Sequence, residues 1–392
     1  MDERVQFVAD FLSGGYTMSE LCRRYNVSRP TGYRLVTRYE QAKGPAGLLP
    51  ESRRPHRSPH ATPESEAEAI VACRRRHPDW GPVKILDHLQ LHGPDRPWPA
   101  PSTAGAILKR HGLVTARRQR RTVPAAARPT TAMTAPNDVW TIDFKGHFRT
   151  RNGEWCYPLT VMDGASRYLL ACVALTGTRT RPTATVLERL FREYGLPRRI
   201  RSDNGVPFAG PTALARLSVL AVSWIRLGIM PELIQPGCPA QNGRHERMHR
   251  TLKASTARPP AATRAAQQRR FVRFRAEYNQ VRPHAALQGL PPAMIYVPSA
   301  RLYPAQIPPL EYAGHFEVRR VSASGSIKWR DHAIWVSEVL AGEQIGCEEI
   351  ADAEWAVYFG PMRLGTLDER LGRIRPYAQL RDGRSPDTSG SR

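Results

Sequence analysis

The pattern of apolar residues changes at Pro136, and this change limits what the chain can fold into. Before Pro136 the apolar residues recur at helical spacing behind capping residues, and after it short runs rich in β-forming residues dominate. A chain of 392 residues is also too long for one ordinary compact domain. We therefore expect a multidomain protein in which helical units precede an α/β domain.

The segment after Pro136 has the order of a mixed α/β sheet. Strand-like runs cover residues 139–144, 157–162, 168–173 and 199–202, and helix patterns cover 183–194, 211–227 and 243–253. Sequential strands followed by strands that alternate with helices indicate such a sheet. From about Phe316 to Arg375 short strand-like runs alternate with glycine turns, which predicts a small C-terminal β-barrel-like domain.

The first forty residues show the signs of a helix-turn-helix. The apolar face of the first helix consists of Val5, Val8, Phe11 and Leu12. Thr17 and Glu20 form a capping box for a second helix. Asn26 then tolerates the left-handed conformation of a tight turn, and Ser28 caps a third helix. A short turn between helices is typical of motifs that dock into DNA.

The third helix carries the expected DNA contacts. Its groove-facing positions are Arg29, Thr31, Arg34 and Arg38. Tyr33 and Leu35 are then left for packing. An ordinary three-helix bundle with a solvated basic face is the alternative interpretation, and the short turn with a basic third helix favours DNA recognition.

Composition and helix signals divide the chain into seven segments. We expect a helix-turn-helix domain at 1–42, a linker at 43–61, a second helical DNA-binding domain at 62–115, a basic linker at 116–136, an α/β core with trailing helices at 137–300, a β-rich domain at 301–380 and a disordered tail at 381–392. The arginine-rich run at 117–121 is either a solvated tether or a phosphate contact, and the sequence leaves both open.

The charge of the chain favours a polyanionic partner. Lys and Arg number 58 against 35 Asp and Glu, which gives a formal net charge of +23. Nucleic acid is the first candidate, because neutralised phosphates release counterions and so drive binding. Acidic lipid, or a basic protein without such a partner, is the alternative.

Other features of the sequence limit the cellular compartment and the cofactors that we expect for this protein. The sequence has no basic-then-apolar signal at its start and no apolar run of membrane-spanning length, so we expect a cytoplasmic protein that is not bound to a membrane. Its 6 cysteines form no C-x-x-C pair, which argues against a disulfide scaffold and a zinc finger. No P-loop motif is present, so ATP is not expected to bind.

Three carboxylates occupy unusual positions. Asp143 lies within a strand-like run, where acidic residues are disfavoured. Asp203 ends another strand before an Asn-Gly turn, and Glu246 lies on a helix. Two Mg²⁺ ions about 3.5–4 Å apart can activate an attacking oxygen and stabilise a leaving one. Mg²⁺ prefers a few carboxylates together with water and substrate phosphate. The set is therefore consistent with phosphoryl transfer on DNA.

The segments around these residues resemble a known family. Ile142-Asp143-Phe144-Lys145-Gly146, Arg201-Ser202-Asp203-Asn204-Gly205 and Asn242-Gly243-Arg244-His245-Glu246-Arg247 resemble the three motifs of the DDE catalytic core. Retroviral integrases and many bacterial insertion-sequence transposases share that core. The segments Arg247 to Lys253 and Tyr278 to His284 are similar to the bacterial branch.

The resemblance implies an RNase H-like core and a transposase. It implies Mg²⁺ or Mn²⁺, two ions in all, with Asp143, Asp203 and Glu246 as metal ligands and catalytic residues. It also implies that the protein binds the terminal inverted repeats of its element and target DNA, and we expect a homo-oligomer on DNA. The gap between Asp203 and Glu246 is longer than is common in the superfamily. No N-terminal His/Cys zinc set is present, which favours a transposase over a viral integrase.

Residues near the acidic set have expected roles of their own. Arg250 and Lys253 share a helix face with Glu246, where they are expected to contact phosphates, the alternative being an intrahelical ion pair. The two histidines of this helix, at 245 and 249, are expected to face solvent or DNA. Asp163 competes as an acidic ligand, but we expect it to satisfy a turn or to pair with Arg167.

Two other functions remain open from the sequence. One is a transcriptional repressor that keeps the helix-turn-helix and has no catalytic activity. The other is an RNase H-like nuclease that cuts RNA–DNA hybrids without joining strands.

Overall fold

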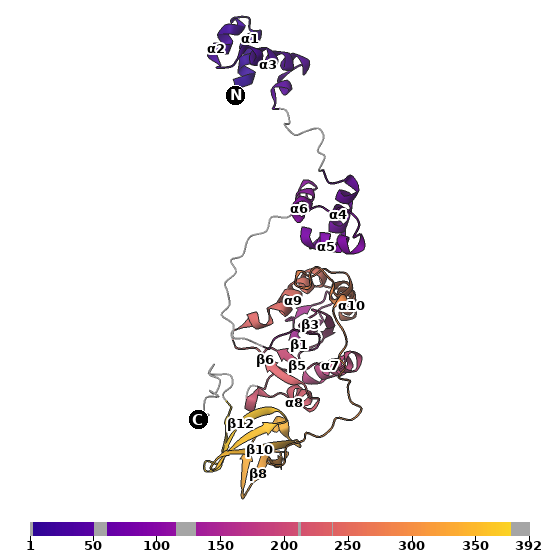
Figure 1. Cartoon of the computed structure of the whole chain (residues 1–392), viewed down its shortest axis with the longest axis vertical. Helices are drawn as coiled ribbons and strands as arrows, with labels where there is room; N and C mark the ends of the chain where they lie inside the picture. The colour runs from indigo at the N-terminus through magenta and orange to yellow at the C-terminus, as the bar shows by residue number, and fades with distance from the viewer. Residues whose placement is uncertain (1–2, 51–60, 115–130, 211–212, 237, 378–392) are drawn as a thin grey trace. The chain divides into compact units, whose positions relative to one another are not determined.

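The structure is a computed structural model that describes residues 3–50, 61–114, 131–210, 213–236 and 238–377 (Figure 1). Contacts divide the chain into two compact units, Met1–Pro63 and Glu64–Arg392. Much of the expected linker at 43–61, the arginine-rich run and the expected disordered tail lie outside the described residues. The finer expected domain boundaries stay predictions.

The first unit is a small helical bundle. Its helices are α1 (Glu3–Leu12), α2 (Met18–Arg24) and α3 (Arg29–Gln41), followed by the 3₁₀ helix η1 (Pro45–Leu48). The capping box of α2 is present, with both reciprocal hydrogen bonds between Thr17 and Glu20. Asn26 has a φ of 52°, as the tight turn requires.

The expectations that Leu12 and Tyr33 pack in the core of this unit are wrong. Tyr33 is 56% exposed and Leu12 is 53% exposed, whereas Phe7 is buried. Gly32 explains the orientation of α3, because a Cβ at that position would meet Phe7 at 2.9 Å and the Met18 sulfur at 2.8 Å. The close approach at Gly32 turns the neighbouring Tyr33 outward, and Leu35 packs inward as expected.

The second unit begins with three more helices. These are α4 (Glu64–Arg76), α5 (Pro82–His92) and α6 (Pro101–Arg110). Prolines stand at the first turns of α5 and α6, where they remove no helical hydrogen bond. The three helices share one hydrophobic cluster that includes Ile70, Trp80 and Ile107.

A mixed sheet follows, as the sequence predicted, and it has six strands where four strand-like runs were expected. Its strands are β1 (Val139–Phe144), β2 (Phe148–Arg149), β3 (Trp155–Asp163), β4 (Leu169–Leu175), β5 (Arg199–Ser202) and β6 (Met230–Leu233). The order is β2-β3-β1-β5-β6, with β4 also paired to β3. β1 runs antiparallel to β3 and parallel to β5, and β5 runs parallel to β6.

Helices cover both faces of this sheet. They are α7 (Thr180–Tyr194), α8 (Val219–Arg226), α9 (Gly243–Thr256) and α10 (Arg264–Gln280), with 3₁₀ helices η2 (Leu214–Arg216), η3 (Pro239–Asn242), η4 (Ala285–Leu287) and η5 (Pro292–Met294) between or after them. Side chains alternate along β1, so Trp140 and Ile142 join a hydrophobic cluster with α7 and α8. Met162 of β3 belongs to a separate cluster with α9 and α10.

The expected long helix over 211–227 is wrong. The structure has the short η2 and then α8, and Pro211 lies outside the described residues. Ala215 has a φ of 50° and Arg216 a φ of 56°, values that a continuing helix does not allow. Ser218 then starts α8 afresh by accepting a hydrogen bond from the amide of Ala221.

The C-terminal part is rich in strands. They are β7 (Glu317–Arg320), β8 (Ser326–Trp329), β9 (His332–Trp335), β10 (Gln344–Ala351), β11 (Glu354–Phe359), β12 (Met362–Asp368) and β13 (Arg373–Pro376), with the 3₁₀ helix η6 (Glu338–Leu340). They form a five-stranded sheet in the order β13-β12-β11-β10-β7 and a separate pair, β8 and β9. Because the described strands do not close on themselves, the expected barrel is not confirmed.

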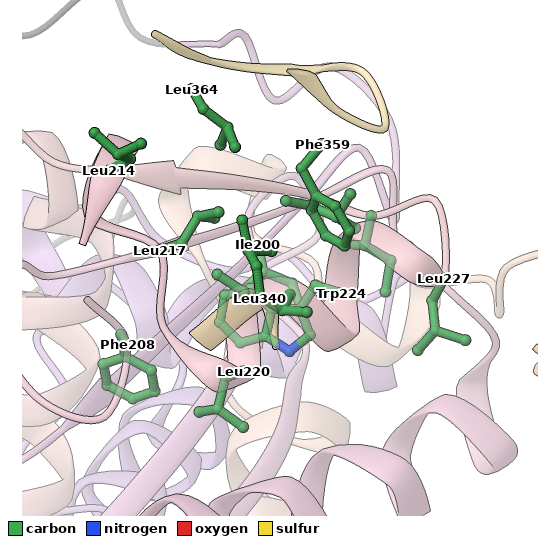
Figure 2. Packing of buried hydrophobic residues seen from close by; sticks show 14 of the residues in the cluster. Ile200, Phe208, Leu214, Leu217, Leu220, Trp224, Leu227, Leu340, Phe359 and Leu364 are labelled. Atoms are coloured by element: carbon green, nitrogen blue, oxygen red, sulfur yellow. The ribbon is translucent and has the colours of Figure 1, made fainter. Parts of the chain in front are cut away.

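One hydrophobic cluster joins the mixed sheet, α8 and the C-terminal strands. Figure 2 shows Ile200 of β5, Trp224 of α8 and Phe359 of β11 among its buried residues. None of the helices in the described part of the chain is both long enough and apolar enough to cross a membrane.

Replacing Trp224 with alanine should destabilise the protein strongly. The Trp224 side chain is only 2% exposed, so its removal leaves a cavity in the shared cluster. We expect the free energy of unfolding to fall by about 3–5 kcal/mol in denaturant titrations. Val219→Ala is the control, because Val219 lies on the same helix and is 54% exposed, and its effect should stay within about 0.5 kcal/mol. Equal effects of the two substitutions would contradict the burial of Trp224 in this cluster.

Candidate active site

Two of the three predicted carboxylates come to the same edge of the mixed sheet. β1 and β5 run parallel, and Thr141 lies opposite Arg201. Asp143 and Asp203 each follow two residues later, so the register carries both toward the same end of the sheet. Asp203 lies just past β5, where its Oδ1 accepts a hydrogen bond from the Gly205 amide at 3.1 Å.

Helix α9 contributes the third carboxylate. Its buried residues are His245, Met248, His249, Leu252 and Thr256, which lie on one face at helical spacing. Met248 and Leu252 of this face pack in the cluster beside the sheet. Glu246 lies in the first turn and is exposed, next to the buried face.

Electrostatic coupling links the three acids. The pKa of Asp143 is raised from 3.8 to about 7, first by burial, then by the charge of Asp203 and, more weakly, by that of Glu246. The Phe144 amide and the Lys145 ammonium oppose this shift. Asp143 is therefore a desolvated carboxylate that two like charges repel, an arrangement that a cation would relieve.

The oxygen-rich set fits Mg²⁺ by its chemistry. Among the residues that the structure describes, no group of three or more His, Cys, Asp or Glu side chains is arranged to hold a metal ion. Mg²⁺ does not need such a cage, because it keeps several waters and is usually bound through one or two carboxylates plus substrate phosphates. Asp143 and Asp203 at one sheet edge meet that requirement, and Glu246 lies close enough to shift the pKa of Asp143.

A basic hollow lies beside Glu246. It has a volume of about 370 Å³ and is lined by Lys145, Glu246, Arg250, Lys253, Ala254 and Arg258. The expectation that Glu246, Arg250 and Lys253 share one face is confirmed. Lys145 joins them from the end of β1, two residues beyond Asp143. Four cations and one carboxylate around an open hollow suit a phosphate group next to an acidic site.

The expected exposure of His245 and His249 is wrong. Both imidazoles are buried, with 0% and 3% exposure. The Oγ1 atom of Thr160 lies 2.6 Å from Nε2 of His245 and 2.7 Å from Nε2 of His249. Burial lowers the pKa of His245 to about 3 and lowers the pKa of His249 still further, so both rings are neutral.

Asp163 has the structural role that the sequence favoured. It is fully buried at the end of β3, and its carboxylate accepts hydrogen bonds from the Asn137 amide and from the amide and hydroxyl of Ser166. These hydrogen bonds hold the turn that follows β3. Arg167 donates instead to the carbonyl of Gly164.

The predicted DNA contacts in α3 are partly brought together. Thr31, Arg34 and Arg38 line a hollow of about 660 Å³, whereas exposed Arg29 does not. Arg38 also donates a hydrogen bond to the carbonyl of Leu49, which ties α3 to the segment after η1. The roles of these side chains in binding DNA stay predictions.

Family profiles match most of the described chain. An integrase core domain matches residues 133–239, and a second integrase core domain profile matches 227–292. A helix-turn-helix domain matches residues 3–56, and a homeodomain-like domain matches 31–108. The integrase matches contain Asp143, Asp203 and Glu246.

Two curated relatives come from bacterial insertion elements. The chain is 30% identical over 164 residues to the insertion element IS476 uncharacterized 39.2 kDa protein of Xanthomonas euvesicatoria, which covers 41% of this chain and 45% of that protein. It is 30% identical over 189 residues to the insertion element IS407 uncharacterized 31.7 kDa protein of Burkholderia multivorans, which covers 48% of this chain and 65% of that protein. The chain thus spans about half to two thirds of the length of these relatives.

A solved structure is also similar. The catalytic core domain of HTLV-2 integrase in complex with magnesium matches with a TM-score of 0.33 and 15% identity, over 42% of this chain and 98% of that chain.

Proposed function

We propose that the chain is a DNA transposase that cuts and joins strands at the ends of an insertion sequence. The premise is its membership of the integrase-core superfamily, which the integrase core domain matches at residues 133–239 and 227–292 and the insertion-element relatives support. The observation that carries the proposal is the meeting of Asp143 and Asp203 at one sheet edge, with Glu246 coupled to Asp143. The basic hollow beside Glu246 gives the DNA backbone a place next to these acids.

Asp143, Asp203 and Glu246 would hold Mg²⁺ or Mn²⁺, two ions in this proposal. When bound, such ions supply activation of an attacking oxygen and stabilisation of a leaving oxygen at phosphorus. Arg250 and Lys253 contact the phosphates on either side of the reacting one and so keep the strand in place. Asp143 lies on β1, Asp203 directly follows β5 and Glu246 lies on α9, so regular elements hold or adjoin all three acids and keep their oxygens in a fixed frame.

The reaction has two phosphoryl transfers. Water first attacks the phosphodiester at an element end, the P–O3′ bond breaks, and a 3′-hydroxyl is released. That hydroxyl then attacks a target phosphodiester, so a new P–O bond replaces the one that breaks. No protein–DNA covalent intermediate is needed, and no Ser or Tyr nucleophile is assigned.

The helix-turn-helix units select the site of reaction. In this proposal Arg29, Thr31, Arg34 and Arg38 of α3 contact the terminal inverted repeats, and target DNA enters the core separately. Two element ends must be held together for joining, so a homo-oligomer assembles on the DNA.

A strand-transfer assay tests the proposal. The full chain, incubated with Mg²⁺ or Mn²⁺ and labelled DNA carrying the inverted repeats that flank its gene, should yield nicked ends and products joined to a target plasmid. EDTA should abolish both products. Tight, repeat-specific binding without either product would favour the repressor. Cleavage of RNA–DNA hybrids without joined DNA would favour the nuclease.

A further inference from the structure

A buried polar cluster lies where α9 meets the sheet. His245 and His249 stand on the face of α9 that otherwise packs with apolar residues. They reach Thr141 of β1 and Thr160 of β3, whose hydroxyls lie 2.7 Å from His245 Nδ1 and 2.7 Å from His249 Nε2. Buried polar groups are costly unless they are hydrogen-bonded, so four of them at one interface indicate a specific arrangement.

Thr160 is the centre of this cluster. Its hydroxyl donates to the backbone carbonyl of Asp143 at 3.0 Å, and a carbonyl can only accept. With its single proton used there, the hydroxyl must accept from Nε2–H of both His245 and His249. His245 Nδ1 is then an acceptor for the Thr141 hydroxyl, whose single proton goes to this nitrogen at 2.7 Å and not to the more distant Met162 carbonyl at 3.2 Å. This assignment satisfies each of these short contacts with two neutral rings.

The cluster fixes α9 relative to β1. Asp143 pairs with Thr160 across the antiparallel β1–β3 ladder, so the Thr160 hydroxyl stands on the face that carries the Asp143 side chain. Glu246 directly follows His245 in α9. Apolar side chains at positions 245 and 249 would permit the helix to rotate or slide, whereas hydrogen bonds are directional and allow one placement.

We propose that Thr160, His245 and His249 form a positioning clamp that sets the spacing between Asp143 and Glu246 required to bind the divalent cation. The clamp rests on the proposed metal-dependent function. His249 Nδ1 lies 3.6 Å from Oδ2 of Asp143, which is too long for a hydrogen bond but close enough to limit how that carboxylate turns. These residues act through the acids, so they are positioning residues and not catalytic ones.

Thr160→Val tests the clamp, because it removes the hydroxyl and keeps a side chain of similar shape. Calorimetric titration of the DNA-free full chain with Mn²⁺ should show an affinity about 10–100-fold weaker than that of the wild type. Thr160→Ser keeps the hydroxyl and should restore most of the affinity. Thr183→Val is the matched control, because Thr183 on α7 is also fully buried and its hydroxyl donates to the carbonyl of Arg179, the N-cap residue of that helix.

A second measurement does not need the metal. Long-range ¹H–¹⁵N spectra of the histidine side chains should show His245 and His249 as neutral rings protonated at Nε2 in the wild type, and a changed His249 signal in Thr160→Val. A wild-type His249 protonated at Nδ1 would overturn the clamp, whether or not the variant folds.

The outcomes separate the two proposals. If the wild type binds Mn²⁺ and folded Thr160→Val binds it equally well, the clamp is overturned and the transposase proposal stands. If the wild type binds no Mn²⁺ in this DNA-free titration, the clamp is overturned, and the strand-transfer assay decides the transposase proposal separately. Weak binding by Thr160→Val with recovery in Thr160→Ser supports both.

Discussion

Asp143→Asn should lower the rate of strand cleavage by about three orders of magnitude or more. In the absence of metal, the same variant should nevertheless have a higher free energy of unfolding than the wild type. The loss of rate follows from the proposed role, because an amide is a poor ligand for Mg²⁺ and several kcal/mol of transition-state stabilisation disappear with the carboxylate. Single-turnover cleavage of labelled element ends measures this effect.

The stabilisation follows from the pKa of Asp143. Folding raises this pKa from 3.8 to about 7, chiefly through burial and then through repulsion by Asp203. Between these two values the folded protein retains a proton that the unfolded chain has lost, so wild-type stability falls as pH rises from about 4 to 7. Asn carries no charge, so Asp143→Asn should gain on the order of 1–3 kcal/mol above pH 7 and almost nothing near pH 4.

Denaturant titrations of the metal-free proteins at pH 4, 6 and 8 measure this difference. Asp138→Asn is the control, because the Asp138 carboxylate accepts hydrogen bonds that lower its pKa, and its replacement should destabilise at neutral pH. A wild-type rate in Asp143→Asn would remove this residue from the catalytic set. A variant that is less stable than the wild type at pH 8 would contradict the repulsion between Asp143 and the neighbouring acids.

Asp143 and Asp203 show what local sequence signals can predict. Each lies in or beside a short run of β-forming residues, and the bounds of β1 and β5 match the predicted runs at 139–144 and 199–202. Because parallel strands bring equivalent positions to one edge, two local predictions combine into one about the site. The family resemblance added Glu246, which has no comparable local signal.

The positions that sequence reasoning missed depend on distant partners. His245 and His249 lie in a mostly polar helix, and their burial depends on Thr160, which is 85 residues from His245 in the chain. Periodicity alone does not reveal such a pair. Tyr33 was predicted inward, but the contacts of Gly32 with α1 and α2 decide the orientation of α3. A spacing pattern also says nothing of the break at Ala215, which ends the expected long helix before α8.

DNA affinity should depend steeply on salt. With a net charge of +23 and basic residues around the site, we expect about 6–10 phosphate contacts. Affinity for element-end DNA should then fall by about 10³–10⁵ between 50 and 200 mM salt, because each neutralised phosphate releases bound counterions. Fluorescence anisotropy at several salt concentrations measures the slope of log affinity against log salt.

Arg250→Gln combined with Lys253→Gln links this slope to the basic hollow beside Glu246. Removing two phosphate contacts should lower the slope by about two, since each contact contributes about 0.9. Arg192→Gln is the matched control, because Arg192 is paired with Glu188 on the surface of α7, and it should leave the slope nearly unchanged. Equal slopes for the double variant and the control would show that the hollow does not hold the DNA backbone. The assignment of Arg250 and Lys253 to phosphates would then be wrong, whether or not the acids are catalytic.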